Sequence, residues 1–342
     1  MFPTLSNRRT PLVFVFFFLS LSALASPDTD LINGAGATLP APLYQKWFNQ
    51  VKTAHPDVQI NYQDIGSGAG LRQLMEPTVD FGASDKFVSD ADLAKMKIKP
   101  LHFPTVLGAV VLTYNIPGLS KQLNLTPETI VGIFLGQIKK WDDPKLVAAN
   151  PGLKLPSVNV LVVHRSDGSG TSYVFTEYLA KISPEWKSRV GVNDSVNWPL
   201  GMGGKGTAGV AGLIKQHPYS IGYVELLFAR QNKLAYAALK NAAGNFVQPS
   251  TEAVTAAAAS VKMPDDFRVS IVNAAGPAAY PISTYTWLLI PSRIADTAKR
   301  KDLTDFLHWM LITGQKEAAP LGYAPLPDSV VAAELKQIAL IK

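Results

Sequence analysis

The pattern that decides the fold is clearest in Val162-Val163-His164-Arg165-Ser166-Asp167-Gly168-Ser169-Gly170-Thr171-Ser172. An apolar β-branched run ends there in a cation and an acid, and two glycines flanking a serine then lead into apolar residues at helical spacing. This order predicts a strand, a tight loop and the start of a helix. The first turn of a helix has backbone N–H groups without intrahelical partners and carries positive partial charge. With the hydroxyls of Ser169 and Thr171, the loop is predicted to hold a small oxyanion.

Two charged side chains accompany this loop. Arg165 stands shortly before it and offers a planar fork of donors that suits two oxygens of one anion. Asp167 is the group expected to hold the guanidinium in place. The same residues also suit an ordinary Gly/Ser turn with a surface ion pair, and this stretch alone leaves both interpretations open.

Two more segments of the chain have the same design. Residues 34–38, Gly-Ala-Gly-Ala-Thr, follow a predicted strand that begins at Leu31, and residues 66–70, Gly-Ser-Gly-Ala-Gly, follow a predicted strand over 58–65. A helical apolar pattern resumes after each segment, and Thr38 is predicted to cap the first of these helices. Helix starts of this kind give an anion many neutral donors. We therefore predict that the three loops converge on one oxyanion site.

Asp85 follows a short predicted strand over 79–84 and has the opposite charge to the one an anion site needs. A carboxylate only accepts hydrogen bonds, so it repels a fully deprotonated tetraoxyanion and accepts from one that still carries a proton. Phosphate at neutral pH has such a proton and sulfate does not, so Asp85 would select phosphate by excluding sulfate. The alternative is that Asp85 merely caps the helix that starts near Ser89.

Strands and helices alternate along the chain, which predicts an α/β architecture. The order of elements in the first part repeats in kind, though not in sequence, over residues 116–279. Two α/β lobes joined by more than one crossing of the chain fit this order, with a ligand held between them. The loops fall at the carboxyl ends of strands, where open parallel sheets bind ligands. Later elements are predicted to be a helix capped by Thr126, an alanine-rich helix over 252–261, a strand over 284–290 and a final helix over 303–312.

Composition excludes several classes of function. The chain has 342 residues, of which 47% are hydrophobic and 17% charged, as in a well-packed globular protein. The absence of cysteine excludes structural disulfides, thiolate metal sites, thiol nucleophiles and lipid attachment through an N-terminal cysteine. The five histidines are scattered, and the basic residues behind the net charge of +6 are dispersed along the chain. We predict neither a metal site nor a nucleic-acid partner.

Residues 1–25 differ from the rest of the chain. Arg8 and Arg9 precede an apolar stretch that ends in Ala23-Leu24-Ala25, the small-x-small pattern of a cleavage site. This pattern predicts a cleavable secretory signal peptide, with the mature chain beginning at Ser26. No later segment reaches the length of a transmembrane helix, so we expect an exported, soluble, periplasmic protein without membrane insertion.

A series of motifs spans the predicted mature chain in order: Gly34-Ala-Gly-Ala-Thr-Leu-Pro-Ala-Pro, Val79-Asp-Phe-Gly-Ala-Ser-Asp85, Ile138-Lys-Lys-Trp-Asp-Asp, Arg165-Ser-Asp-Gly-Ser-Gly-Thr171, Gly203-Gly-Lys-Gly206, Ile221-Gly-Tyr-Val-Glu225 and Leu326-Pro-Asp-Ser-Val330. By these motifs the chain resembles the periplasmic phosphate-binding proteins of bacterial ABC phosphate importers. The resemblance implies a type II periplasmic-binding-protein fold, with a mixed sheet flanked by helices in each of two lobes and the ligand in the cleft between them. We expect lobe I to comprise residues 26–115 and 280–342, and lobe II residues 116–279.

The resemblance also implies a function. Family members bind one buried phosphate and deliver it to a membrane permease and its ATPase, so we expect a monomeric receptor with no catalytic residues and no cofactor. The residues implied to contact phosphate are Thr38, Leu39 through its backbone, Ser67, Asp85, Arg165, Ser169, Gly170 and Thr171, with Asp167 orienting Arg165. Leu39 stands where family members carry phenylalanine, and His164 stands where an arginine is expected.

Competing hypotheses come from the same residues. Ser169, His164 and Asp167 are the residue types of a hydrolase triad, but residues so close in sequence rarely reach triad geometry, and the Gly-x-Ser-x-Gly elbow is missing. Residues 201–207 imitate a phosphate-binding loop without its Gly-Lys-Thr order, so ATP binding is not expected. A binding protein for sulfate or molybdate remains an alternative if Asp85 points out of the cleft.

Overall fold

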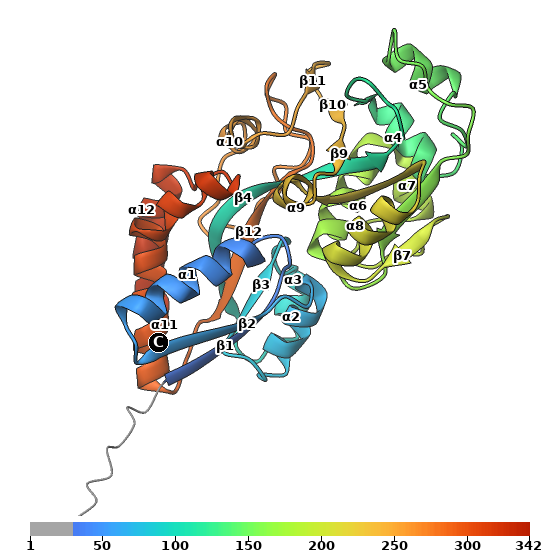
Figure 1. The fold of residues 1–342 in the computed structure, drawn as a ribbon. Coiled ribbons are helices and arrows are strands. Elements are labelled where there is room, and N and C mark those ends of the chain that lie inside the picture. The colour runs from blue at the N-terminus through green and yellow to red at the C-terminus, as the bar shows by residue number, and fades with distance from the viewer. Residues whose placement is uncertain (1–29) are drawn as a thin grey trace, which may run out of the picture.

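The structure is a computed structural model, and it describes residues 30–342. The predicted signal peptide and the predicted start at Ser26 lie outside the described residues. Figure 1 shows an α/β architecture, in which helices surround a strongly twisted sheet. The nine-stranded mixed sheet has the order β2 (Val58–Gln63), β1 (Asp30–Gly36), β3 (Phe81–Ser84), β12 (Ser283–Pro291), β4 (Pro100–Asn115), β8 (Ser220–Glu225), β6 (Leu161–Arg165) and β7 (Met202–Gly204), with β9 (Ala235–Tyr236) paired to β4.

One long strand links the two sides of this sheet. The first part of β4 pairs antiparallel with β12, and its last residues pair with β8 and β9. We call β2, β1 and β3 with their helices the β1 side, and β8, β6 and β7 with theirs the β6 side (Figure 1). On the β1 side, β1 runs parallel to β2 and β3, and on the β6 side, β6 runs parallel to β7 and β8. The division into lobes at particular residues stays a prediction.

The helices follow the strands in the expected alternation. Thr126 accepts a hydrogen bond from the Thr129 backbone N–H and caps its helix as predicted. The described helices are α1 (Ala41–Ala54), α2 (Ser67–Met75), α3 (Asp90–Leu93), α4 (Pro127–Phe134), α5 (Pro144–Ala149), α6 (Gly170–Ile182), α7 (Pro184–Arg189), α8 (Gly206–Gln216), α9 (Leu226–Gln231), α10 (Thr251–Ala259), α11 (Thr297–Ile312) and α12 (Asp328–Gln337), with short 3₁₀ turns at Gly314–Glu317, Ala319–Leu321 and Ile338–Leu340. A small second sheet joins β11 (Phe246–Val247), β10 (Ala238–Lys240) and β5 (Asn124–Leu125).

Two predictions about helices are wrong. Thr38 does not cap α1, because Pro40 occupies the cap position and the Thr38 hydroxyl instead contacts Thr207 and Glu225. The helix over 303–312 is also not the last one, since α12 follows it. The buried face of α12 contains Glu334 and Gln337, and these polar residues interrupt the apolar pattern by which a helix is recognised.

Aromatic side chains fill the core on both sides of the sheet. On the β1 side, Tyr44 and Phe48 of α1 pack against Tyr62 and Phe81. On the β6 side, Phe175 packs edge-on against Phe134 and lies against Tyr223 and Trp198. Such clusters bury large apolar areas and fix the strands whose ends carry the loops. Within residues 30–342, no helix combines the length and apolar character needed to cross a membrane.

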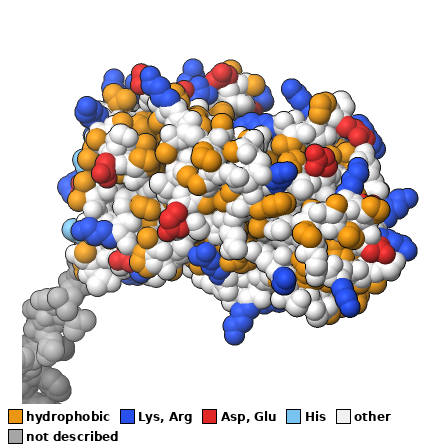
Figure 2. Space-filling view, turned by 90° about the horizontal axis from the view of Figure 1, so that it is seen from above, with side chains coloured by type: hydrophobic (Ala, Val, Ile, Leu, Met, Phe, Trp, Pro, Cys, Tyr) orange, Lys and Arg blue, Asp and Glu red, His pale blue; other side chains and the backbone are white. Residues whose placement is uncertain are grey.

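Charged side chains are dispersed over one face of the molecule (Figure 2). On the face seen in Figure 2, Lys and Arg side chains lie singly or in small groups among hydrophobic and uncharged atoms, with Asp and Glu between them. This distribution differs from the continuous basic stripe of a nucleic-acid-binding surface.

Glu334 is a carboxyl group in the core of the protein. Its side chain is fully buried, and neither of its oxygens has a hydrogen-bond partner among residues 30–342. Burial raises the pKa of Glu334 well above its ordinary value of 4.5, because the charged form loses its hydration. Burial therefore favours the protonated form of this carboxyl in the folded protein, where it remains a polar group in an apolar core.

Glu334→Leu is expected to raise the free energy of unfolding by about 1–3 kcal/mol near pH 7. In the unfolded chain Glu334 ionises near its ordinary pKa, so unfolding releases a proton above that pH and the parent protein loses stability as the pH rises. Denaturant unfolding at about pH 5 and about pH 8 measures both effects. Glu334→Gln is the matched control, since it keeps the buried polar group but cannot ionise. A parent and a Leu variant with equal stability and equal pH slopes would contradict this assignment.

Candidate functional site

The three glycine-containing loops converge, as predicted. The Gly66 backbone N–H donates to the Gly36 carbonyl over 2.8 Å, and the Gly68 N–H donates to the Gly168 carbonyl over 3.2 Å. Gly66 has a φ of +94°, a conformation that favours glycine, and a Cβ there would lie 2.6 Å from the Gly168 oxygen. The end of β1, the start of α2 and the start of α6 therefore meet in one place.

Arg165 supplies a positive charge where the three loops meet. It is the last residue of β6, and its guanidinium is nearly inaccessible to solvent. Its Nε and Nη2 donate to the two oxygens of Asp167 over 2.8 and 2.6 Å, and its Nη1 donates to the hydroxyls of Thr207 over 3.2 Å and Thr38 over 3.4 Å. Burial pushes the pKa of Asp167 upward, but the hydrogen bonds and charge of Arg165 outweigh it and hold that pKa below its ordinary value. Asp167 thus orients the guanidinium, in the arrangement predicted.

The predicted hydroxyl and backbone donors lie at the starts of α2 and α6 and in the segment between β1 and α1. Ser67 begins α2, and its Oγ accepts from the Asp85 backbone N–H over 3.2 Å. Ser169 caps α6 by accepting from the Ser172 N–H over 3.1 Å. Thr171 lies in the first turn of that helix and is buried like both serines. Leu39 is buried, and its carbonyl accepts from the Tyr323 hydroxyl over 2.6 Å.

Asp85 is a buried carboxyl group at the end of β3, and it faces the α6 loop. One of its oxygens, Oδ1, accepts from the Thr286 hydroxyl over 2.9 Å, while Oδ2 has no hydrogen-bond partner among the described residues. A Cβ added to Gly170 would lie 2.8 Å from that Oδ2, so the unpartnered oxygen lies against the start of α6. Burial and then the charge of Glu225 raise the pKa of Asp85 to about 7, against the opposing contacts of Thr286, Arg165 and Ser67.

The alternative role of Asp85 as a helix cap is wrong. Ser89 caps α3 by accepting from the Asp92 backbone N–H over 3.1 Å. A sulfate or molybdate protein required Asp85 to point out of the cleft, whereas this side chain is 1% exposed. The geometry therefore keeps an acceptor among the donors, as a site for a proton-bearing anion requires.

Sequence reasoning missed two residues of this site, Thr207 and Glu225. Thr207 lies in the first turn of α8, after Gly206, and Glu225 ends β8. The Oε1 of Glu225 accepts from the hydroxyls of Thr171 over 2.8 Å and Thr207 over 2.9 Å. The sequence contains a pattern that could have indicated each residue. Residues 201–207 have glycines and a hydroxyl before a helix, as the other three loops do, and Glu225 is an acid at the carboxyl end of a strand.

The hydrolase triad is not assembled. His164 stacks on Trp198, with ring centroids 4.9 Å apart, and its Nδ1 lies 3.0 Å from the Arg165 carbonyl. Ser169 is engaged as a helix cap and Asp167 pairs with Arg165. In the described part of the chain, no hydrogen bond or ion pair joins the three side chains, and within that part no group of His, Cys, Asp and Glu residues could hold a metal ion. The triad hypothesis is therefore wrong.

An ion pair joins the β1 side to the β6 side beside the site. Lys86 Nζ lies 2.9 Å from an Asp194 oxygen, and both side chains are mostly buried. The same ammonium lies 5.2 Å from the centroid of the Tyr173 ring. The Asp194 carbonyl in turn accepts from the Ser169 backbone N–H over 2.9 Å. These contacts hold the α6 loop against the residues that follow β3.

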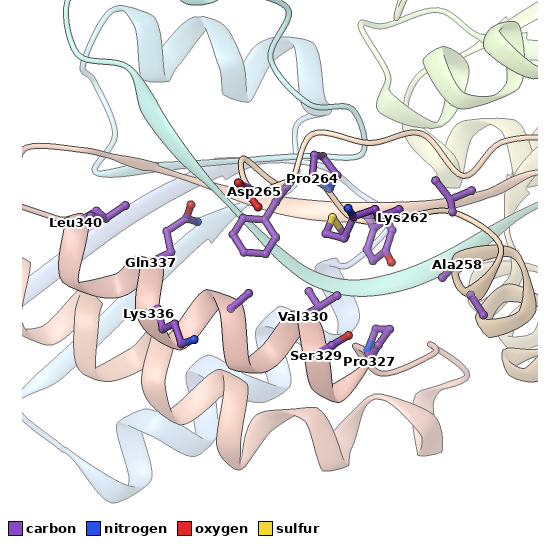
Figure 3. Close-up of a pocket in the computed structure, with 16 residues that line it drawn as sticks. Ala258, Lys262, Pro264, Asp265, Pro327, Ser329, Val330, Lys336, Gln337 and Leu340 are labelled. Atoms are coloured by element: carbon purple, nitrogen blue, oxygen red, sulfur yellow. The ribbon is translucent and has the colours of Figure 1, made fainter.

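One groove of the described protein lies away from the converging loops. A groove of about 750 Å³ lies between α10 and α12, and the lining side chains labelled in Figure 3 come from those helices and adjoining loops. None of the predicted site residues lines this groove. A cavity of about 300 Å³ borders the site itself, with Thr38 and Thr207 in its wall. The candidate site is therefore the place where the three loops meet.

Comparison with known proteins gives consistent results. Residues 22–312 match the PBP superfamily domain. "Phosphate-binding protein PstS" of Xylella fastidiosa (strain Temecula1) is 46% identical over 303 residues, covering 88% of this chain and 82% of the relative. The protein of the same name from Haemophilus influenzae is 42% identical over 319 residues, covering 92% of this chain and 95% of the relative. The fold is similar to that of the periplasmic phosphate-binding protein PfluDING bound with phosphate, with a TM-score of 0.74, 24% identity and coverage of 89% and 92% of the two chains.

Proposed function

Because this chain belongs to the family of PstS phosphate-binding proteins, within the PBP superfamily, we propose that it binds inorganic phosphate and delivers it to an ABC-type phosphate importer. It acts in the periplasm as a monomer, without catalysis and without a cofactor, and its partners are the permease and ATPase subunits of the importer. Phosphate contacts Thr38, the Leu39 backbone, Ser67, Asp85, Arg165, Ser169, Gly170 and Thr171, with Asp167 orienting Arg165.

The observation that carries this proposal is the unpartnered oxygen of Asp85. Asp85 Oδ2 is buried and faces Gly170, in a place otherwise supplied with donors by Arg165 and three helix or loop starts. Leaving such an acceptor unpaired costs about 1–3 kcal/mol, which a hydrogen bond from the guest recovers. While Asp85 is ionised, only an anion that carries a proton satisfies the donors and this acceptor together. Phosphate meets that condition at neutral pH, and sulfate does not.

The proposal includes closure of two lobes on the anion. Lobe I comprises residues 26–115 and 280–342, and lobe II comprises residues 116–279. Release to the importer requires the lobes to separate, because the proposed ligands Asp85 and Arg165 are both buried. With this division, the ion pair of Lys86 with Asp194 next to the proposed site would have to break when the lobes separate.

Calorimetric titration of the protein tests the proposed function. At about pH 8 we expect one phosphate to bind per chain and sulfate to leave no heat of binding. The surface variant Arg189→Ala is the control, since Arg189 is exposed and pairs with Glu185 on its own short helix. Tight sulfate binding under these conditions, or an absence of phosphate binding, would overturn the proposal.

Sulfate exclusion is expected to depend on pH. Asp85 has a pKa of about 7, so above that pH its carboxylate repels sulfate, and below it the protonated carboxyl donates to a sulfate oxygen. Sulfate affinity should therefore fall about tenfold per pH unit above about pH 7 and level off below it. Calorimetry between about pH 5.5 and 8.5 measures the profile. Asp85→Asn, which cannot ionise, should bind sulfate without this dependence, and a flat profile in the parent protein would refute the role of Asp85.

A further inference from the structure

Glu225 gathers three threonine hydroxyls at one carboxylate oxygen. Its Oε1 accepts from Thr171 over 2.8 Å, from Thr207 over 2.9 Å and from Thr38 over 3.2 Å. The three threonines come from the start of α6, the start of α8 and the segment after β1, so one buried oxygen ties together elements that are remote in sequence. Two of these hydroxyls, on Thr38 and Thr171, belong to the proposed phosphate site.

The contact with Thr207 reaches Arg165. A carboxylate only accepts, so the single hydroxyl proton of Thr207 goes to Glu225 and its lone pairs accept from the guanidinium. Arg165 Nη1 donates to that hydroxyl over 3.2 Å, while Nε and Nη2 donate to Asp167. Two carboxylates thus fix the guanidinium from two directions, Asp167 directly and Glu225 through Thr207.

We propose that Glu225 is a positioning residue of the phosphate site, which holds the Thr38 and Thr171 hydroxyls in place until phosphate accepts their protons and, through Thr207, sets the orientation of Arg165. This inference rests on the proposed function. It assigns to Glu225 no contact with the anion, and it gives Thr207 the role of the link between the carboxylate and the guanidinium.

Glu225 also places a second negative charge beside Asp85. Its Oε2 is buried and has no hydrogen-bond partner in the part of the chain that the structure describes. After burial itself, the charge of Glu225 is the next cause that raises the pKa of Asp85. Arg165 faces both carboxyl groups and opposes this effect on Asp85. The other titratable groups facing Asp85 or Glu225 are phenols whose pKa values burial raises, so they stay neutral: Tyr44, Tyr62 and Tyr323.

Phosphate titration of Thr207 and Glu225 variants tests the positioning role. Thr207→Val removes the hydroxyl at nearly constant volume and should weaken phosphate binding about tenfold, whereas Thr207→Ser should restore it. Glu225→Ala should weaken binding by a similar factor, and the double variant should be no weaker than the weaker single variant, because both changes break one chain of contacts. Losses that multiply in the double variant, or parent affinity in Thr207→Val, would overturn the inference.

The pH profile of sulfate binding gives a readout that packing alone would not move. Glu225→Gln keeps an acceptor oxygen but removes the charge, so the pKa of Asp85 should fall and sulfate should begin to bind at a lower pH than in the parent. A profile identical to that of the parent would overturn the electrostatic part of the role. If the parent itself binds no phosphate, the proposed function fails; if the parent binds and all Glu225 and Thr207 variants match it, only this inference fails.

Discussion

Arg165→Ala is expected to weaken phosphate binding by at least about a hundredfold. Arg165 is 3% exposed and supplies the positive charge among the donors of the site. A hydrogen bond to a charged group contributes about 1.5–3 kcal/mol, so losing the bond of the one guanidinium N–H that is left for the anion, together with the buried positive charge, corresponds to a factor of about a hundred or more. The substitution also leaves Asp167 without its bidentate partner and adds uncompensated negative charge near the anion.

Titration calorimetry of Arg165→Ala and Arg165→Lys measures this effect. Lysine keeps the charge but lacks the planar fork, so Asp167 and an anion cannot both be held as before, and we expect an intermediate affinity. Arg189→Ala removes a surface cation from the same part of the chain and should bind as the parent does. Parent affinity in Arg165→Ala would remove Arg165 from the site.

Gly170→Ala is expected to weaken phosphate binding by about tenfold to a hundredfold. A Cβ at Gly170 would overlap the Ser67 hydroxyl and lie 2.8 Å from both Cβ and Oδ2 of Asp85. Inserting a methyl group into packed space costs about 1–3 kcal/mol. The added group would push the α6 loop away from the loops of the β1 side and fill space next to the proposed acceptor.

Gly212→Ala in α8 is the matched control for this substitution. A Cβ at Gly212 meets no atom within 4 Å, so the change should leave phosphate affinity as in the parent. The unfolding free energy of both variants separates a local effect from loss of the fold. Phosphate affinity equal to that of the parent in Gly170→Ala would show that the loops do not close on the anion in this arrangement.

The local parts of the site could be predicted because their chemistry is local. Glycines, a hydroxyl and a resuming apolar pattern specify a helix start within a few residues, and this holds at Ser67 and Ser169. Because the carboxyl ends of parallel strands lie at one edge of a sheet, the loops that follow these strands could be predicted to lie close together. Asp167 beside Arg165 also follows from neighbouring positions in the sequence.

The remaining parts depend on contacts between distant segments. The residues around Thr38 predict a helix cap, but its hydroxyl donates to Glu225, which is 187 residues away in the sequence. Thr207 lies in a segment that resembles a phosphate-binding loop only in part. Its role in the site comes from its contact with Arg165, which is 42 residues away in the sequence. In α12 the buried Glu334 replaces an expected apolar residue, so tertiary packing rather than local pattern decides that helix.

The proposed function depends on a tetrahedral anion that donates a hydrogen bond to Asp85. A crystal structure of the protein with phosphate tests this most directly. We predict phosphate between the starts of α2 and α6, with one of its oxygens about 2.5–2.7 Å from Asp85 Oδ2 and others facing the Arg165 guanidinium. Phosphate bound elsewhere, or an Asp85 side chain turned away from it, would contradict the account.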